Sequence, residues 1–338
     1  MSVATGWEFV AITMLVYLGV NLIACLGLNL QYGTAGVLNF AFIVFQAAGA
    51  YVAALFAVGP SSSSGGFQTY VGGWDFPFPL PWLVATITGA VIAVPIGLVG
   101  LRRLRSDYQA MVMLVVSLIA TTVVVSFPGF LNGSAGIALV PPPLGTLLNP
   151  ISVQYGWLYV GLTAVCCMVV FVLVSALARS PLGRNWRAMR ENEAVAIAVG
   201  LDVNRLRMLV FVVGGAIAAL SGAVLVDFIS AWSPDAWLYP ETFAFFTALI
   251  VGGLGNSMGA LIGAVLVPTL LLEGVTLLPT FANPTVSLGL QWVVIGVVII
   301  AFLWFRPQGI VPERKTVIAP PDNTAAALAT GHKAQEAG

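Results

Sequence analysis

Charged side chains are scarce in this chain. Only 8% of its 338 residues are Asp, Glu, Lys or Arg, and 59% are hydrophobic, whereas soluble domains carry about 25% charged residues. Apolar runs of about 20 residues, the length that a helix needs to cross a bilayer, recur along most of the sequence. A membrane β-barrel would instead show segments of about ten residues in which apolar and polar side chains alternate. The composition therefore predicts an all-α, polytopic membrane protein.

Histidine and cysteine are also rare, which removes several kinds of site. The only histidine, His332, lies in a polar C-terminal tail, and Cys25, Cys166 and Cys167 fall inside apolar runs. Cysteines in such surroundings act as small buried hydrophobes, so we expect no metal site, no disulfide and no catalytic residue. The first positive charge is Arg102, whereas a cleavable signal peptide begins with a basic region. We therefore expect the first apolar segment to be the insertion signal.

We expect about nine transmembrane helices, of which the seventh is short for a full crossing. The expected spans are residues 9–29, 35–58, 81–100, 110–128, 157–178, 207–228, 240–254, 258–279 and 287–305. Two long connections, 59–80 and 129–156, are rich in Gly and Pro, which interrupt regular helices. Residues 1–312 then form one membrane domain, and residues 313–338 form a polar tail that we expect to be disordered and cytoplasmic.

The positions of the cations indicate an orientation. All 13 Lys and Arg residues lie within 102–105, within 179–207, or from Arg306 onward. The positive-inside rule places the corresponding segments, 101–109, 179–207 and 306–338, in the cytoplasm, with the N-terminus outside. A re-entrant segment at 30–58 would place the N-terminus inside instead. The predicted topology puts five acids at or near the outer face: Glu8, Asp75, Asp227, Asp235 and Glu241.

The middle basic stretch, "RSPLGRNWRAMRENEAVAIAVGLDVNRLR" at 179–207, has an internal pattern. Ser180-Pro181 is typical of a helix start, and Gly200 is typical of a helix end. Between them, small residues including Ala196 alternate with Val and Ile. A short helix with small side chains and charged flanks predicts docking into a groove of a partner. Topology signalling is the alternative, and it requires only the arginines.

This stretch and the span after it, "MLVFVVGGAIAALSGAVL", resemble the cytoplasmic loop and following span of permease subunits of branched-chain amino acid ABC importers. Three other stretches resemble the same family in the family's order: residues 26–55, residues 233–268 and "FRPQGIV" at 305–311. The resemblance implies an ABC importer permease-type bundle in a bacterial cytoplasmic membrane. It also implies that 179–207 is the loop that couples the permease to its ATPases. The candidate coupling residues are Arg187, Arg190, Glu191, Glu193, Ala196 and Gly200.

The resemblance also implies partners. These are a second permease subunit, identical or different, two cytoplasmic ATPase subunits and an extracytoplasmic solute-binding protein. ATP and Mg²⁺ would bind the ATPase subunits. We therefore expect that this chain is not itself an enzyme and holds no cofactor. Its glycine-rich "VGGLGNSMGALIG" lacks the preceding strand and the Lys-Ser/Thr of a phosphate-binding loop.

The sequence departs from the family pattern at Ala41, Gln46 and within 129–156. The resemblance therefore indicates the type of transporter but does not identify the solute. Branched-chain and other hydrophobic amino acids are the first expectation. Urea, short amides or another small polar solute are the alternatives within the same kind of transporter.

Three sets of residues are candidates for other roles. Polar residues in the spans are costly in lipid, so they either form hydrogen bonds with neighbouring helices or line the solute path. Asn39 and Gln46 are seven residues apart, about two helical turns, so we expect both on one helix face along the path. The outer acids either dock a binding protein or form a solvated rim. Small residues four apart predict close helix packing. The path candidates are Asn21, Asn29, Gln31, Asn39, Gln46 and Glu273, the docking candidates are Asp75, Asp235 and Glu241, and the packing candidates are Gly214, Ala218, Gly222, Gly255, Gly259 and Gly263.

An ion-coupled secondary transporter is the competing class. It predicts an ion-coupling carboxylate near mid-membrane and an inverted repeat. Glu273 is the only acid well inside an expected span, and no convincing repeat is visible. A purely structural membrane subunit is a third possibility, which the polar residues in the spans disfavour.

Overall fold

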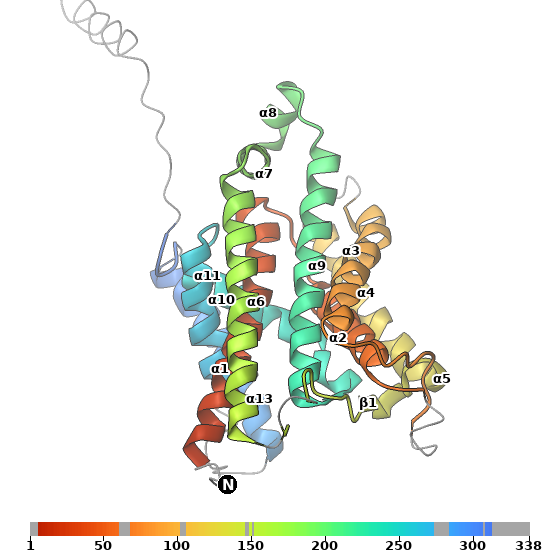
Figure 1. Cartoon of the computed structure of the whole chain (residues 1–338). Coiled ribbons are helices and arrows are strands. Elements are labelled where there is room, and N and C mark those ends of the chain that lie inside the picture. The colour runs from red at the N-terminus through yellow and green to blue at the C-terminus, as the bar shows by residue number, and fades with distance from the viewer. Residues whose placement is uncertain are drawn as a thin grey trace, which may run out of the picture.

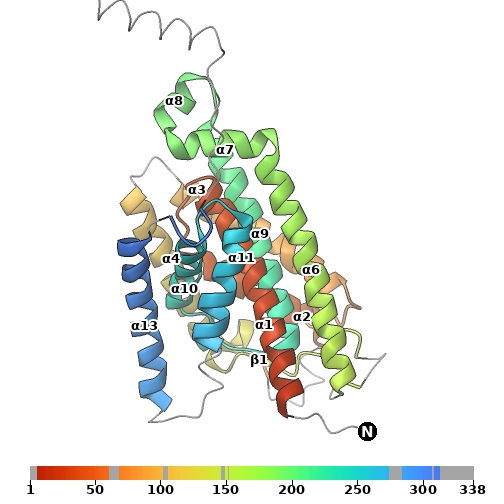
Figure 2. The same ribbon diagram turned by 90° about the vertical axis from the view of Figure 1, so that its left-hand side faces the viewer.

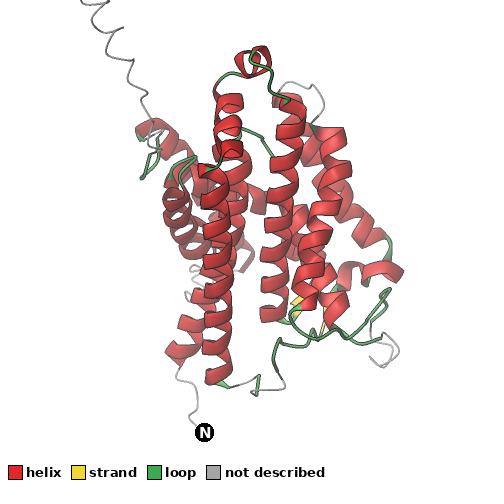
Figure 3. Cartoon of the chain, turned by 45° about the horizontal axis from the view of Figure 1, so that its top comes forward, coloured by secondary structure: helices red, strands yellow, loops and turns green. Residues whose placement is uncertain are grey.

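The chain forms a bundle of helices with one very short strand pair (Figure 1, Figure 3). The structure is a computed structural model that describes residues 6–60, 68–101, 106–145, 149–150, 152–273, 284–306 and 308–312. The tail expected at 313–338 and the arginines at 102, 103 and 105 lie outside the described residues.

The elements follow one another along the chain as helices joined mostly by short turns. The first half comprises α1 (Gly6–Leu28), the π-helix η1 (Asn29–Thr34), α2 (Phe42–Ala57), α3 (Leu80–Gly100), α4 (Ser106–Ser126), α5 (Pro128–Leu131), η3 (Gly133–Ala135) and β1 (Ile137–Ala138). The second half comprises α6 (Val153–Arg179), α7 (Pro181–Glu191), α8 (Glu193–Ala198), α9 (Val203–Ile229), β2 (Ala231–Trp232), η4 (Pro234–Trp237), α10 (Tyr239–Gly252), α11 (Ser257–Ala264), the π-helix η5 (Val265–Glu273) and α13 (Pro284–Phe305).

Within the described residues the expected spans coincide with helices except at the start of the second, and the predicted all-α membrane fold is confirmed. Five described helices are long and apolar enough to cross a membrane: Gly6–Thr34, Leu80–Gly100, Tyr108–Ser126, Val153–Arg179 and Val203–Ile229. Three shorter apolar helices accompany them, at Phe42–Ala57, Ser257–Leu271 and Trp292–Phe305. The count of nine crossings stays a prediction, because helices of this length do not by themselves establish a full crossing.

The second span differs from its predicted form. The first helix continues through η1 to Thr34, and Gly36, with φ of 71°, ends it. Helix α2 begins only at Phe42, so Asn39 lies in an irregular connection rather than on a helix. The prediction that Asn39 and Gln46 share a helix face is therefore wrong, because the two-turn spacing requires both residues to be helical.

Small residues let α9 lie directly against α2. A Cβ atom on Gly222 would collide with the Gln46 carbonyl oxygen, and a Cβ atom on Gly49 would collide with the Ala219 backbone. Such close backbone contact is what small residues at helix interfaces allow in membranes. Ala218, on the same stripe as Gly222, is fully buried.

A second close contact joins α10 and α11. Cβ atoms on Gly259 and Gly263 would collide with backbone oxygens of α10, those of Gly252 and Ala248. Gly255 has φ of 77° and lies in the turn before α11. The assignment of Gly255 to a helical stripe is therefore wrong, because the positive φ takes it out of the helix.

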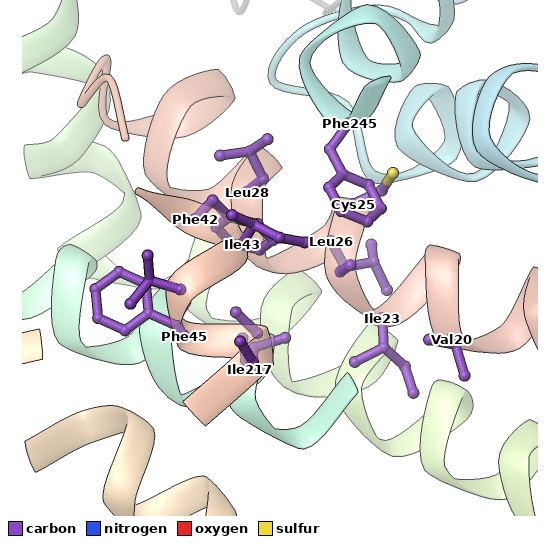
Figure 4. Packing of buried hydrophobic residues seen from close by; sticks show 14 of the residues in the cluster. Val20, Ile23, Cys25, Leu26, Leu28, Phe42, Ile43, Phe45, Ile217 and Phe245 are labelled. Carbon is purple, nitrogen blue, oxygen red and sulfur yellow. The ribbon is translucent and has the colours of Figure 1, made fainter. Parts of the chain in front are cut away.

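Large apolar side chains from four helices fill the space between these contacts (Figure 4). Ile23 and Leu26 of α1, Phe45 of α2, Ile217 of α9 and Phe245 of α10 all belong to this buried cluster. The cluster holds α1 in the centre of the bundle, where its polar residues meet the neighbouring helices.

Candidate functional site

The α7–α8 pair projects beyond one end of the bundle (Figure 1, Figure 2). Ser180 caps α7, its hydroxyl accepting a hydrogen bond from the Gly183 N–H at 3.3 Å, and Pro181 is the first helical residue. At the other end, α8 stops at Gly200, whose φ is 87°. The Gly200 N–H donates to the Ile197 carbonyl at 3.0 Å, as in left-handed helix ends. The predicted helix start and stop are both confirmed.

Three side chains fasten this projection to the long helices on either side. The Trp186 indole is fully buried, and its Nε1–H donates to the Leu206 carbonyl at the start of α9 at 3.1 Å. Arg187 donates to the Ala178 carbonyl of α6 at 3.0 Å. Arg207 forms an ion pair with Glu193, with 2.6 Å between nitrogen and oxygen. These contacts fix the α7–α8 pair to the adjoining ends of α6 and α9.

Trp186 is not among the coupling residues predicted from the sequence. A signal was present, because Trp186 is the only aromatic residue between Arg179 and Arg207. An isolated tryptophan in a charged segment is typical of an anchor, since its large apolar body gains most from burial.

The outer surface of α8 consists of branched apolar side chains rather than of the small alanine side chains that the sequence predicts. Val195, Ile197 and Val199 are 57%, 57% and 71% exposed, whereas Ala196 is only 2% exposed. The interpretation that Ala196 faces a partner is therefore wrong, because it packs against its own chain. Exposed apolar side chains grouped at a projecting tip mark an interaction surface, and we call these three residues the α8 face. Glu191 is also exposed nearby.

Arg190 connects α7 to the interior of the bundle. Its guanidinium Nη1 donates a hydrogen bond to the Gly33 carbonyl of η1. Its aliphatic stem lies against Gly36, where an added Cβ atom would come within 2.8 Å of the Arg190 Cγ. A residue of the projecting pair thus holds the end of the first membrane helix.

A buried amide network continues from η1. Gln31 donates to the Phe211 carbonyl of α9 at 2.9 Å and accepts from the Asn39 amide at 3.0 Å. The Asn39 side chain in turn accepts from the Ala41 N–H at 3.1 Å. Gly214 leaves the space that the Gln31 side chain occupies. The network ties η1, α9 and the start of α2 together.

The other path candidates come from α1, η1, α2 and η5. Asn29 accepts a hydrogen bond from the Gly255 N–H at 3.0 Å, and Asn21 donates to the Thr269 hydroxyl at 3.3 Å. Gln46 is buried within α2, and the side chain of Glu273 lies outside the described residues. Asn21, Asn29, Gln31 and Asn39 thus make hydrogen bonds inside the protein, the first of the two roles that the sequence left open.

The described parts of the three basic segments lie at the end that carries α7 and α8. The Gln109 amide near the start of α4 donates to the Leu38 carbonyl at 3.0 Å. Past α13, the Ile310 N–H donates to the Val251 carbonyl at 2.9 Å. Leu38 follows η1, and Val251 lies in the last turn of α10.

The outer acids lie toward the other end. Asp75 follows α2 and is exposed, and Asp235 is exposed in η4, next to the strand pair that joins Ile137 to Trp232. Glu241 is half-buried in the first turn of α10. The described arginines thus gather at the α7–α8 end, together with acids such as Glu193 and Asp202, whereas the described charged residues at the other end are acids.

Comparison with known proteins gives a family match over most of the chain. The family described as "Branched-chain amino acid transport system / permease component" matches residues 10–303. The chain is 26% identical to the high-affinity branched-chain amino acid transport system permease protein LivM of Salmonella typhimurium, over 92% of this chain and 73% of that protein. It is 26% identical to the probable branched-chain amino acid transport permease protein LivM of Methanocaldococcus jannaschii, over 91% and 94%. It is also 26% identical to the permease LivH of Escherichia coli, over 71% and 77%. No solved structure matches.

Proposed function

This chain belongs to the family of permease components of branched-chain amino acid transport systems, and we propose that it is one transmembrane subunit of an ATP-driven importer for branched-chain amino acids. The observation that carries this proposal is the α7–α8 pair. It projects from the bundle, exposes an apolar face and is anchored to three membrane helices.

We propose that the importer contains a second permease, two ATPase subunits and a solute-binding protein. Relatives named LivM and LivH both match this chain, which supports a core of two related permeases. ATP and Mg²⁺ would bind the ATPase subunits, and this chain would perform no chemical step. We place it in a bacterial cytoplasmic membrane with α7, α8 and the basic segments in the cytoplasm. Asp75, Asp235 and Glu241 would then face the binding protein.

The coupling route follows from the contacts of α7. When the ATPases close on ATP, they would displace the α8 face. Because Trp186 and Arg187 fix the pair to α9 and α6, these helices would move with it. Arg190 would carry the same displacement to Gly33, and the Gln31 amide would pass it on to α9.

The solute path has fewer candidates than the sequence predicts. The amides of Asn21, Asn29, Gln31 and Asn39 are used within the protein. Gln46 remains our proposed path residue, since a zwitterionic solute at lipid depth needs polar partners.

The test places a charge on the α8 face. In the complex with its ATPases, Ile197→Asp should prevent ATPase association and abolish leucine uptake into vesicles, because a buried unpaired charge at an interface is costly. Asn204→Asp is the matched control, since it adds the same charge at an exposed position of α9. Normal ATPase association and normal uptake by the Ile197 variant would refute the proposed coupling surface.

A further inference from the structure

Asp227, near the outer end of α9, is a buried acid that the coupling route does not use. It is only 3% exposed. The Trp82 indole N–H donates to its Oδ2 at 2.6 Å, whereas its Oδ1 is buried without a hydrogen-bond partner among the described residues. A buried carboxylate is costly unless it is paired and fully hydrogen-bonded. The second oxygen therefore lacks the partner that would make this burial favourable.

The described part of the chain offers no cation to pair with Asp227. Six of the described arginines lie at the end that carries α7 and α8: Arg179, Arg184, Arg187, Arg190, Arg205 and Arg207. The seventh, Arg306, directly follows the last turn of α13. Arg207, on the same helix as Asp227, is about 20 residues away, which corresponds to about 30 Å of α-helix. A counter-charge for Asp227 would have to come from a bound molecule.

Asp227 lines a cavity of about 450 Å³ that could admit such a molecule. This volume is typical of small-molecule sites, which span about 300–1,000 Å³. Its walls are the end of α2 at Ala57, the segment from Asp75 to Pro81, and a proline-rich turn that includes Pro142. Asp75, exposed at the same cavity, is the only other acid that lines it.

The composition of the cavity indicates one class of ligand. Apart from its two acids, the side chains that line it are apolar, among them Phe76, Phe78 and Leu144. A metal ion such as Ca²⁺ prefers six to eight oxygen ligands, whereas an ammonium group needs only a few acceptors. Apolar walls beside a carboxylate suit a molecule that carries a primary ammonium on a short aliphatic chain.

We propose that this cavity binds a small aliphatic molecule through its primary ammonium group, with the Asp227 carboxylate as counter-ion. Phe76, Phe78 and the prolines would surround the aliphatic part, and Asp75 would attract the cation to the cavity. The ligand class is thus an amine without a carboxylate, because the lining offers two acids and no cation to a second, negative group. The ammonium site does not depend on the proposed importer function.

The experiment measures the charge preference of the cavity directly. Ala57→Cys places a thiol in the cavity wall of the purified complex, and mass spectrometry separates its labelling from that of the three native cysteines. The measured quantity is the labelling rate with a cationic trimethylammonium-ethyl thiosulfonate divided by the rate with its anionic sulfonate analogue. We expect this ratio to be at least about tenfold higher in the Ala57→Cys variant than in the variant that also carries Asp227→Asn. The amine 3-methylbutylamine should protect the thiol, and the uncharged 3-methylbutanol should not.

Two variants separate charge from packing. Asp227→Asn keeps an acceptor for the Trp82 indole, so it removes the charge with little change in shape. Trp82→Phe removes the indole hydrogen bond but keeps the carboxylate, and it should retain both the cation preference and the protection by amine.

Three results would overturn the proposal. The first is equal labelling ratios with Asp227 and with Asp227→Asn. The second is protection by sodium chloride as strong as that by the amine at the same concentration, which would indicate a general cation site. The third is loss of amine protection in Trp82→Phe, which would indicate packing as its cause. None of these measurements uses ATP or uptake, so a failed importer function and a failed ammonium site give different results.

Discussion

Removal of the Arg190 guanidinium should uncouple ATP hydrolysis from transport without dissociating the ATPases. Arg190 contacts η1 rather than the α8 face, and its guanidinium donates to the Gly33 carbonyl. Arg190→Met keeps an unbranched stem against Gly36 and removes the charge. A hydrogen bond from a charged group contributes about 1.5–3 kcal/mol. Loss of this free energy from the contact between Arg190 and Gly33 corresponds to roughly a tenfold to hundredfold fall in transport.

The matched control lies one helical turn away. Arg187→Met also removes a guanidinium that bonds a backbone carbonyl, but that carbonyl belongs to Ala178 of α6 and not to η1. In vesicles with the complete importer, we expect Arg190→Met to bind the ATPases normally while leucine uptake per ATP hydrolysed falls. Arg187→Met should change this ratio less. Equal ratios in both variants and the parent would refute the coupling route through Gly33.

Three further predictions concern packing, the amide network and the outer acids. Gly222→Ala should lower the thermal unfolding midpoint of the purified complex, because its methyl group would collide with the Gln46 carbonyl and overpacking costs about 1–3 kcal/mol; an unchanged midpoint would show that α2 and α9 are not in close contact. Gln31→Leu should also lower the midpoint, because it removes two buried hydrogen bonds that contribute about 0.5–1.5 kcal/mol each; a midpoint equal to the parent's would exclude the network. Neutralising Asp75, Asp235 and Glu241 together should slow uptake from the binding protein at low salt and have less effect at high salt; the same reduction at both salt concentrations would exclude electrostatic docking.

Local sequence patterns were enough to predict the membrane class, the position of nearly every described helix of the bundle, and the start and end of the projecting α7–α8 pair. The reason is that a bilayer imposes strong one-dimensional constraints. Each crossing needs a long apolar run, and cations are retained on one side. The caps of α7 and the end of α8 were equally predictable, because Ser180, Pro181 and Gly200 act through their immediate neighbours.

Tertiary structure alone decided what the polar side chains do. Gln31 bonds Phe211, and Trp82 bonds Asp227, across separations of 180 and 145 residues. Ala196 is buried because α8 lies against α9. Asn39 lies outside a helix because Gly36 ends the first helix and α2 begins only at Phe42. No local pattern encodes these outcomes. In an apolar chain most helix faces have similar hydrophobicity, so the pairing of helices depends on where small residues such as Gly214 and Gly222 allow two backbones to meet.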